Sequence, residues 1–376
     1  MKIKIFAAIT LLTLLGCKQI QKATDVVTQP TAREVYERGF DDENSQFTSW
    51  KTAYNRAFKD SLKIELPYTE TGVFNSRNNP VYSYLVSVQE GEKLIVFTEM
   101  QNDSLSVFID LFQKKNDSVF QQKPRISNEP GTKSITYESG KNETVKLILQ
   151  PELAANSSFS MKIYTVPIYG FPVSGAGIKN IQSYWGATRA GGKRSHEGVD
   201  IFAKRGTPVV AVTDGRVSST GNRGLGGKQV WLRDGLFGRS IYYAHLDSIA
   251  TTTGKRVKSG DTLGFVGNTG NAKTTAPHLH FGIYKGYSGA INPLPFIKKQ
   301  KIPEVKNANK DSFGKITRNN SELRIGSSTK FMQVASLQKN DSVMILGKNN
   351  SWYHIQKSDS LKGFIHQSLL KPSSSN

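Results

Sequence analysis

Cysteine is almost absent from the chain, because only Cys17 among its 376 residues carries a thiol. A single cysteine cannot form an intramolecular disulfide, so we expect packing alone to hold the fold. Long apolar runs are scarce too. After the first residues, no stretch reaches the roughly 18 to 20 apolar residues that a membrane-spanning helix needs. With 37% hydrophobic and 21% charged residues, the chain can bury real cores, and its length predicts two or three domains.

The N-terminus has the features of an export signal. Lys2 and Lys4 precede an apolar run, Ile5 to Leu15, which ends in Leu-Gly-Cys at Cys17. This arrangement resembles the lipobox of bacterial lipoproteins. The resemblance implies a signal peptide at residues 1–16, lipidation of Cys17 and a polar tether at 17–34. It also implies a lipid-anchored protein of the cell envelope, which we expect at the outer membrane, facing the periplasm. The alternative is a plain secretory signal followed by a chance cysteine.

Acidic residues are few relative to basic ones. The chain has 50 Lys and Arg against 30 Asp and Glu, a net charge of +20. Removal of residues 1–16 takes away two lysines and no acid, which leaves +18. Such a charge favours a polyanionic neighbour. An exported protein does not meet nucleic acid, so we expect anionic cell wall or lipid headgroups, unless the lysines only solvate the surface.

Residues 35–168 contain a helical segment followed by short strands. Aromatic residues three to four positions apart (Phe47, Trp50, Tyr54 and Phe58) predict a helix with a buried face. From Leu62 to Val166, alternating segments such as "VYSYLVSV" and "KLIVFTEM" are separated by turn residues, which is typical of a β-sandwich. This part has no histidine and no cysteine. It loosely resembles the jelly-roll accessory domains of secreted peptidases.

A second, glycine-rich β region follows at residues 169–297, and a lysine-rich linker is expected at 298–316. The block 317–372 has five predicted short strands and includes "LRIGSS", "SWYHI" and "KGFIHQSLL". These features resemble a bacterial SH3-like domain, which in exported proteins commonly binds peptidoglycan. His354 and His366 lie in this block and are interpreted as ordinary strand residues.

The other four of the six histidines fall between residues 196 and 280. In "HLHFGIY" the alternation predicts a strand, with His278 and His280 on one face and Leu279 and Phe281 turned into a core. A His-x-His strand is more often structural than metal-binding, so other ligands have to be found.

Two further stretches supply them. In "SHEGVDIFA", His196 and Asp200 are an even number of residues apart in an extended segment, which puts them on one face. The helical His-Glu-x-x-His zinc motif is excluded, because position 200 is aspartate and the segment is not helical. In "IYYAHLD" we expect Tyr243 and His245 to share a face. A catalytic zinc site needs three N or O ligands and an open position.

Together these motifs resemble the lysostaphin-type zinc endopeptidases of peptidase family M23. The shared stretches include "HEGVD", "GTPVVAVTDGRV", "YAHLD", "SGDTLGFVGNTGNA" and "PHLHFGIY", over about residues 170 to 297. The resemblance implies a mainly β protein with an N-terminal sandwich, a central antiparallel β peptidase domain and a C-terminal SH3-like barrel. It also implies that His196, Asp200 and His280 bind one Zn²⁺ and that His245 and His278 are catalytic.

The predicted function is hydrolysis of peptidoglycan cross-bridges by a lipid-anchored enzyme. There are two alternatives to this function. Non-catalytic relatives that bind peptidoglycan and activate a cell-wall amidase lose metal ligands, whereas all five positions are present here. A secreted toxin against other bacteria does not agree with the lipobox. The sequence leaves open which bond is cut, the identity of protein partners and the oligomeric state.

Overall fold

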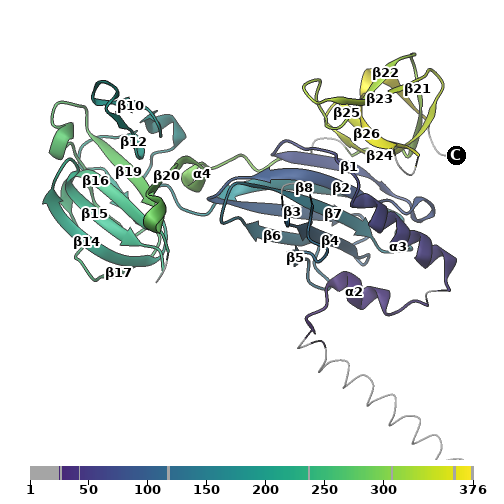
Figure 1. Cartoon of the computed structure of the whole chain (residues 1–376), viewed down its shortest axis with the longest axis horizontal. Coiled ribbons are helices and arrows are strands. Elements are labelled where there is room, and N and C mark those ends of the chain that lie inside the picture. The colour runs from purple at the N-terminus through teal and green to yellow at the C-terminus, as the bar shows by residue number, and fades with distance from the viewer. Residues whose placement is uncertain are drawn as a thin grey trace, which may run out of the picture.

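The computed structural model describes residues 25, 28–41, 43–116, 119–235, 238–305, 308–358 and 361–373. The predicted signal peptide, the lipidation site Cys17 and most of the predicted tether lie outside the described residues. Figure 1 shows a central sandwich, a second β body beside it that is formed by the middle of the chain, and a small C-terminal barrel packed on the sandwich. The mainly β fold predicted from the sequence is confirmed. In the described part of the chain, no helix has the length and apolar character needed to cross a membrane.

Two helices, α2 (Ala32–Glu37) and α3 (Ser45–Ala57), precede the sandwich. The side chain of Asn44 caps α3 by accepting hydrogen bonds from the first free backbone N–H groups. The predicted aromatic stripe lies on the buried face of α3, and Trp50 Nε1 donates to the carbonyl of Pro151 at 2.9 Å. This helix therefore packs against the sandwich through its aromatic side chains.

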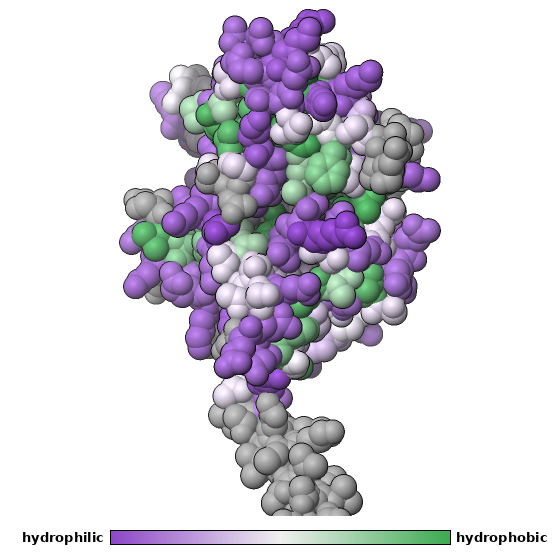
Figure 2. Space-filling view, turned by 90° about the vertical axis from the view of Figure 1, so that its right-hand side faces the viewer, coloured by the Kyte–Doolittle hydropathy of each residue, from purple (hydrophilic) through white to green (hydrophobic). Residues whose placement is uncertain are grey.

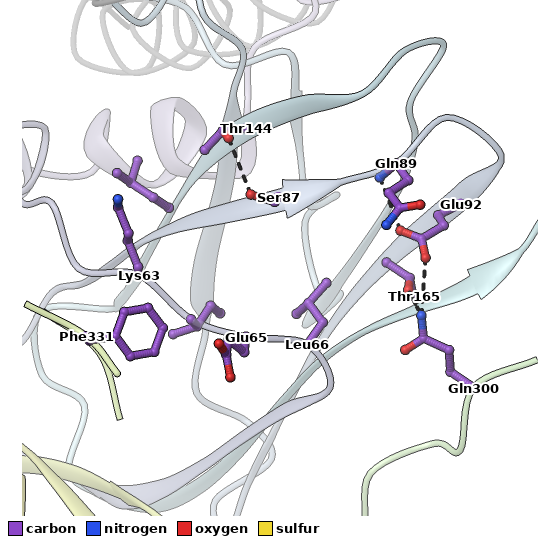
Figure 3. A pocket seen from close by; sticks show the side chains of 12 residues that line it. Lys63, Glu65, Leu66, Ser87, Gln89, Glu92, Thr144, Thr165, Gln300 and Phe331 are labelled. Atoms are coloured by element: carbon purple, nitrogen blue, oxygen red, sulfur yellow. Dashed lines mark hydrogen bonds between the residues drawn. The ribbon is translucent and has the colours of Figure 1, made fainter. Parts of the chain in front are cut away.

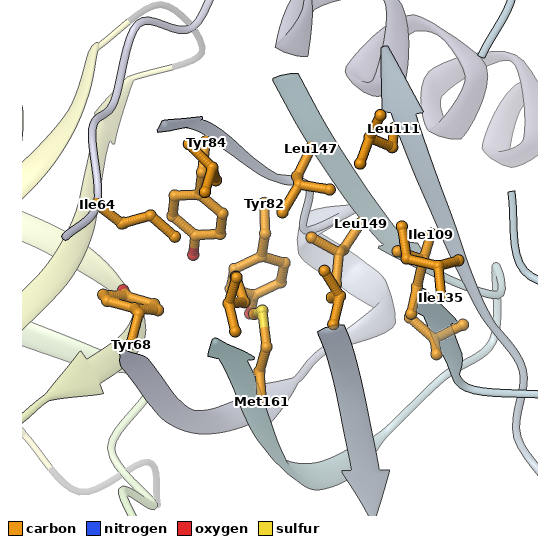
Figure 4. Packing of buried hydrophobic residues seen from close by; sticks show 14 of the residues in the cluster. Ile64, Tyr68, Tyr82, Tyr84, Ile109, Leu111, Ile135, Leu147, Leu149 and Met161 are labelled. Atoms are coloured by element: carbon orange, nitrogen blue, oxygen red, sulfur yellow. The ribbon is translucent and has the colours of Figure 1, made fainter. Parts of the chain in front are cut away.

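The sandwich consists of two antiparallel sheets. One has the order β2-β7-β4-β5, and the other contains β1-β8-β3-β6. Tyrosine, leucine, isoleucine and valine side chains of the two inner faces pack together between the sheets (Figure 4). The strands are β1 (Tyr68–Phe74), β2 (Tyr82–Val88), β3 (Glu92–Met100), β4 (Val107–Phe112), β5 (Ile126–Ser127), β6 (Ser134–Glu138), β7 (Glu143–Pro151) and β8 (Ser157–Pro167), with the short 3-10 helix η1 (Ser76–Asn78) after β1.

The predicted peptidase domain is built on a sheet with the strand order β17-β14-β15-β16-β19-β12-β9. Its inner face is filled with aliphatic and aromatic side chains, among them Val199, Ile201, Leu279 and Phe281. The strands are β9 (Ile181–Ser183), β10 (Thr188–Arg189), β11 (Arg194–Ser195), β12 (Val199–Phe202), β13 (Pro208–Val210), β14 (Gly215–Arg223), β15 (Gly227–Arg233), β16 (Ser240–Ile249), β17 (Arg256–Val257), β18 (Thr262–Val266), β19 (His278–Tyr284) and β20 (Ala290–Ile291), and α4 (Leu294–Ile297) follows.

The C-terminal barrel has its own small core of isoleucine, leucine, valine and tyrosine side chains. Seven strands are described here, rather than the five expected, because two short strands at the start and end of the block, β21 and β27, pair with each other. The strands are β21 (Phe313–Ile316), β22 (Ser321–Arg324), β23 (Gln333–Leu337), β24 (Ser342–Asn349), β25 (Trp352–Ser358), β26 (Leu361–His366) and β27 (Leu370–Ser373).

The barrel continues one sheet of the sandwich, because β24 pairs with β1 at Lys348 and Thr71. At this junction Glu70 and His354 are both fully buried. Oε1 of Glu70 accepts from His354 Nδ1 at 2.9 Å, and Oε2 accepts from the hydroxyls of Tyr68, at 2.6 Å, and Tyr84. Buried polar groups are stable only when they are hydrogen-bonded in this way. The sandwich and the barrel therefore form one packed unit.

The predicted peptidase domain contacts one end of the sandwich. Glu90 accepts hydrogen bonds from Arg239 at 3.2 Å and from Lys285 at 3.0 Å, and the Phe296 ring packs against the backbone at Gly91. Next to this contact, the Gln300 side chain donates to Thr165 Oγ1 at 2.9 Å. These contacts position the domain through polar side chains at the surface of the sandwich.

A groove of about 540 Å³ opens where the sandwich, the linker and the barrel meet. In Figure 3, Lys63 and Phe331 lie at one end of it, and Glu92 and Gln300 at the other. Its lining has neither histidine nor cysteine, and its carboxylates, Glu65 and Glu92, belong to no group of described residues that could hold a metal ion. Seen from the end that carries the barrel, the surface is mostly hydrophilic with small separate hydrophobic areas (Figure 2).

Candidate metal centre

Three neighbouring strands bring the predicted site residues together. β19 lies between β16 and β12 in the sheet. Asp200 on β12 is directly opposite His280 on β19, and Ala244, the residue before His245, is opposite His280 on the other side. His278 and His280 both face the cavity, while Leu279 and Phe281 lie in the core, as the alternation predicted.

The side chains of His196, Asp200 and His280 converge on one point. His196 Nε2 lies 3.0 Å from Asp200 Oδ1 and 3.1 Å from His280 Nδ1, and the last two atoms are 2.9 Å apart. Ligands of a tetrahedral zinc ion with bonds of about 2.0–2.1 Å are about 3.3 Å from one another. The three atoms thus have nearly the spacing of three corners of a zinc tetrahedron. Among the described residues, this is the one group of three acidic, histidine or cysteine side chains close enough to hold a metal ion.

A second layer of contacts orients these ligands. His196 Nδ1 lies 2.9 Å from the carbonyl of Tyr184, which can only accept, so the proton is on Nδ1 and Nε2 is left free for a metal. Asp200 Oδ2 accepts from Arg189 Nη2 at 2.7 Å, which leaves Oδ1 for the metal. Burial opposes ionisation of Asp200, but the close polar contacts with the His196 and His280 rings outweigh it and hold the pKa of this carboxyl well below its usual range.

His245 and His278 face the same cavity, and their rings are 5.1 Å apart. Nδ1 of His245 donates to the carbonyl of Thr269 at 2.9 Å, and Nδ1 of His278 donates to the carbonyl of Ala276 at 2.8 Å. Each neutral ring therefore has its lone pair on Nε2. Burial, and next the positive charges that His280 and His278 can carry, lower the pKa of His245 to about 4. At neutral pH this ring can accept a proton.

The expectation that Tyr243 shares a face with His245 is wrong. His245 has a left-handed backbone, with φ +63°, and this interrupts the alternation of β16. Tyr243 is fully buried in the core, where its hydroxyl accepts from the amide of Val212 at 3.1 Å. Tyr242 instead lines the cavity beside His280, with 5.9 Å between the ring centroids.

The cavity around these residues measures about 1020 Å³. Its lining residues all lie between Gln182 and Tyr284, so no side chain of the sandwich that the structure describes lines it. Gly198 is required beside the site, because a Cβ there would lie 2.6 Å from the carbonyl oxygen of Phe281 and 2.7 Å from Cε1 of His280. The candidate metal ligands are thus tightly packed where His280 meets Gly198, and they line a large cavity formed by the peptidase domain alone.

Two groups of the site escaped sequence reasoning. Arg189 lies on the β10–β11 hairpin, and no periodicity connects it with Asp200 on β12. Tyr242 was missed because of the backbone at His245. For Arg189, the sequence offers one signal, which is the run of basic residues before His196 in "TRAGGKRSH". For Tyr242 it offers none. His354 and His366 lie on β25 and β26, outside the cavity, as expected.

Comparisons with known proteins agree with this geometry. Residues 194–293 match peptidase family M23, and residues 319–371 match the bacterial SH3 domain. The chain is 38% identical over 141 residues to the L-Ala–D-Glu endopeptidase of Bacillus subtilis (strain 168), an alignment that covers 35% of this chain and 43% of that protein.

Two further relatives match over the same region. The glycyl-glycine endopeptidase ALE-1 of Staphylococcus capitis is 39% identical over 109 residues, which cover 28% of this chain and 29% of that protein. The DD-carboxypeptidase/endopeptidase Mpg of Neisseria meningitidis is 37% identical over 123 residues, which cover 32% of this chain and 26% of that protein. The chain therefore spans less than half the length of each of these relatives. It contains a domain that matches peptidase family M23, followed by a domain that matches the bacterial SH3 domain.

Proposed function

We propose that the protein is a zinc-dependent endopeptidase that hydrolyses peptide cross-bridges of peptidoglycan. The observation that carries the proposal is the convergence of Nε2 of His196, Oδ1 of Asp200 and Nδ1 of His280 next to two further histidines with free Nε2 atoms. Two neutral imidazoles and one carboxylate are a donor set that suits zinc. Zinc bound there would supply a Lewis acid for the scissile carbonyl and the attacking water.

The protein's own residues supply the proton chemistry. With Nδ1 held by a backbone carbonyl, the ring of His245 or of His278 can accept a proton from the attacking water on Nε2. The resulting imidazolium then donates to the oxyanion that forms on the substrate and afterwards protonates the leaving amine. Arg189 keeps the Asp200 carboxylate in place during these steps. The SH3 domain, fixed to the sandwich, would hold the enzyme on its polymeric substrate.

The decisive experiment combines metal analysis with digestion of purified sacculi and defined muropeptides by the chain that begins at Cys17. We expect about one zinc per chain and peptide products identified by mass. His280→Ala should lose both metal and activity. His245→Ala should keep the metal and lose about 10²- to 10⁴-fold in rate. His366→Ala, which changes a half-buried histidine of the SH3 domain outside the cavity, is the control and should act like wild type. Equal rates of cross-bridge cleavage by wild type and both site variants would refute the proposal. A metal-free protein that stimulates a separate cell-wall amidase would favour the activator function instead.

We also propose that Cys17 is lipidated and anchors the enzyme in the cell envelope, with the outer membrane as its expected location. The support is the apolar run that ends at the only cysteine of the chain. Mass spectrometry of the N-terminal peptide from the native host should find a lipid-modified cysteine as the first residue. An unmodified mature N-terminus would exclude the anchor and favour a secreted enzyme.

A further inference from the structure

Positive charge is concentrated in the peptidase domain. Residues 169–297 contain 16 Lys and Arg against 6 Asp and Glu, a net charge of +10. Residues 35–168, which are similar in number, contain 15 against 17 and carry a net charge of −2. Half of the charge of the chain thus belongs to the domain with the cavity. A local excess of positive charge attracts anionic ligands to that domain and repels cationic ones.

The excess includes the lining of the active-site cavity. Four basic residues contribute to it, namely Arg189, Lys193, Arg194 and Arg223, against the acidic residues Glu197 and Asp200. Arg189 is neutralised by Asp200 at 2.7 Å. For the other three, no carboxylate lies within 4 Å in the part of the chain that the structure describes.

On one wall, the hairpin of β10 and β11 places Arg194 directly opposite Arg189. Like charges at opposed positions of an antiparallel pair are unfavourable unless an anion lies nearby. Asp200 forms an ion pair with Arg189, whereas Arg194 is exposed and lines the cavity. This wall therefore offers a guanidinium group that can take up an external anion.

On the other side of the catalytic strands, Arg223 ends β14. Its guanidinium contacts the hydroxyl of Ser219 at 2.8 Å and lines the cavity. Burial raises the pKa of Tyr242, and the positive charge of Arg223 opposes that rise, which agrees with a guanidinium close to this tyrosine. β15, β16, β19 and β12 lie between β14 and β9 in the sheet. The β10–β11 hairpin, which carries Arg194, lies beside β9 and β12, because Arg189 of β10 contacts Ser183 and Asp200. Arg223 and Arg194 therefore line the cavity from different ends of the strand order.

We propose that Arg194 and Arg223 bind carboxylates of the substrate peptide and make the enzyme selective for acidic peptides over uncharged glycine bridges. This inference rests on the proposed endopeptidase function and specifies its substrate. Guanidinium groups pair with carboxylates through charge-assisted, often bidentate hydrogen bonds. A polyglycine bridge offers only backbone amides, which cannot neutralise the two arginines. A peptide with a free carboxylate on each side of the scissile bond satisfies both.

The test uses the full, zinc-loaded chain and two peptide series of identical sequence. One series has free carboxylates on the residues flanking the scissile bond, and in the other series these groups are neutral carboxamides. Pentaglycine is the third substrate. We expect kcat/KM to be about ten- to a hundredfold higher for the acidic series, which is the size of one or two charge-assisted hydrogen bonds. The preference should fall as salt rises, because the arginines are exposed to solvent.

Arg194→Gln and Arg223→Gln should each reduce the preference, and the double variant should cleave both series alike while its rate on the carboxamide series stays near that of wild type. Arg256→Gln is the matched control, because Arg256 is an exposed arginine of the same domain outside the cavity lining. Equal kcat/KM of wild type for both series, or a preference that survives in the double variant, would overturn the inference.

The outcomes separate this inference from the proposed function. Cleavage of pentaglycine and carboxamides at the same rate as acidic peptides would leave the endopeptidase function intact and reject the selectivity. If no peptide is cleaved, the proposed function fails, and calorimetric binding of the two series to the zinc-loaded protein still decides the inference. Tighter binding of the acidic series that disappears in the double variant supports it, and equal binding refutes it.

Discussion

Replacing Glu70 by alanine tests whether the sandwich and the SH3 domain are stabilised as one unit. The substitution removes the acceptor of three buried donors, which are His354 Nδ1 and the hydroxyls of Tyr68 and Tyr84. Each buried donor that is left without a partner costs about 1–3 kcal/mol, and we expect about 3–5 kcal/mol for the loss of this shared acceptor. For a unit of about 200 residues, 1 kcal/mol changes Tm by about 2–4 °C. We therefore expect Tm to fall by about 6–20 °C.

Differential scanning calorimetry of the full chain measures this change. The sandwich and the SH3 domain should unfold in one transition in both proteins, and the peptidase transition should stay in place as an internal reference. Glu65→Ala is the control, since Glu65 is an exposed glutamate of the segment leading into β1 and its loss should change stability by no more than about 0.5 kcal/mol. A fall of less than 2 °C for Glu70→Ala, or an SH3 domain that melts separately while the sandwich keeps its wild-type Tm, would refute the reasoning.

Three further predictions concern the metal centre. Gly198→Ala should weaken zinc binding at least about tenfold in a chelator competition, because the new Cβ collides with the ring of His280, whereas Gly221→Ala, in open space on β14, should bind zinc like wild type. Arg189→Gln should weaken zinc binding by about 10- to 100-fold through loss of the contact that orients the carboxylate ligand, and unchanged affinity would show that this contact has no positioning role. In metal-free protein the ring of His245 should titrate by NMR near pH 4, being neutral above that pH and protonated below it, and a midpoint near 6.5 would contradict the burial argument.

The contact between the sandwich and the peptidase domain lies away from the cavity. The sandwich meets the peptidase domain through Glu90 and Gly91, which contact Arg239, Lys285 and Phe296. None of these five residues lines the cavity. The accessory domain therefore positions the peptidase domain from the side and leaves the described approach to the metal centre open.

Local periodicity was enough for much of the site. Alternation placed His278 and His280 on one face of a strand and their neighbours in the core, and the even spacing of His196 and Asp200 placed these two on one face, where the structure brings them together. These inferences succeed because side-chain direction in an extended chain depends on the immediate neighbours only. The aromatic spacing of α3 was readable for the same reason.

The sequence by itself thus determined the β architecture, the order of the peptidase and SH3 domains and the facing of the candidate site residues within each strand, since each of these depends on local patterns of residues. Only the tertiary structure decided the rest. Arg189 of the β10–β11 hairpin pairs with Asp200 of β12. The left-handed backbone of His245 places Tyr242 in the cavity, where alternation predicts Tyr243. Glu70 contacts His354, which is 284 positions later in the sequence. Such contacts depend on how different segments come together in space, and the alternation of side chains within one strand carries no information about which partner segment lies beside it.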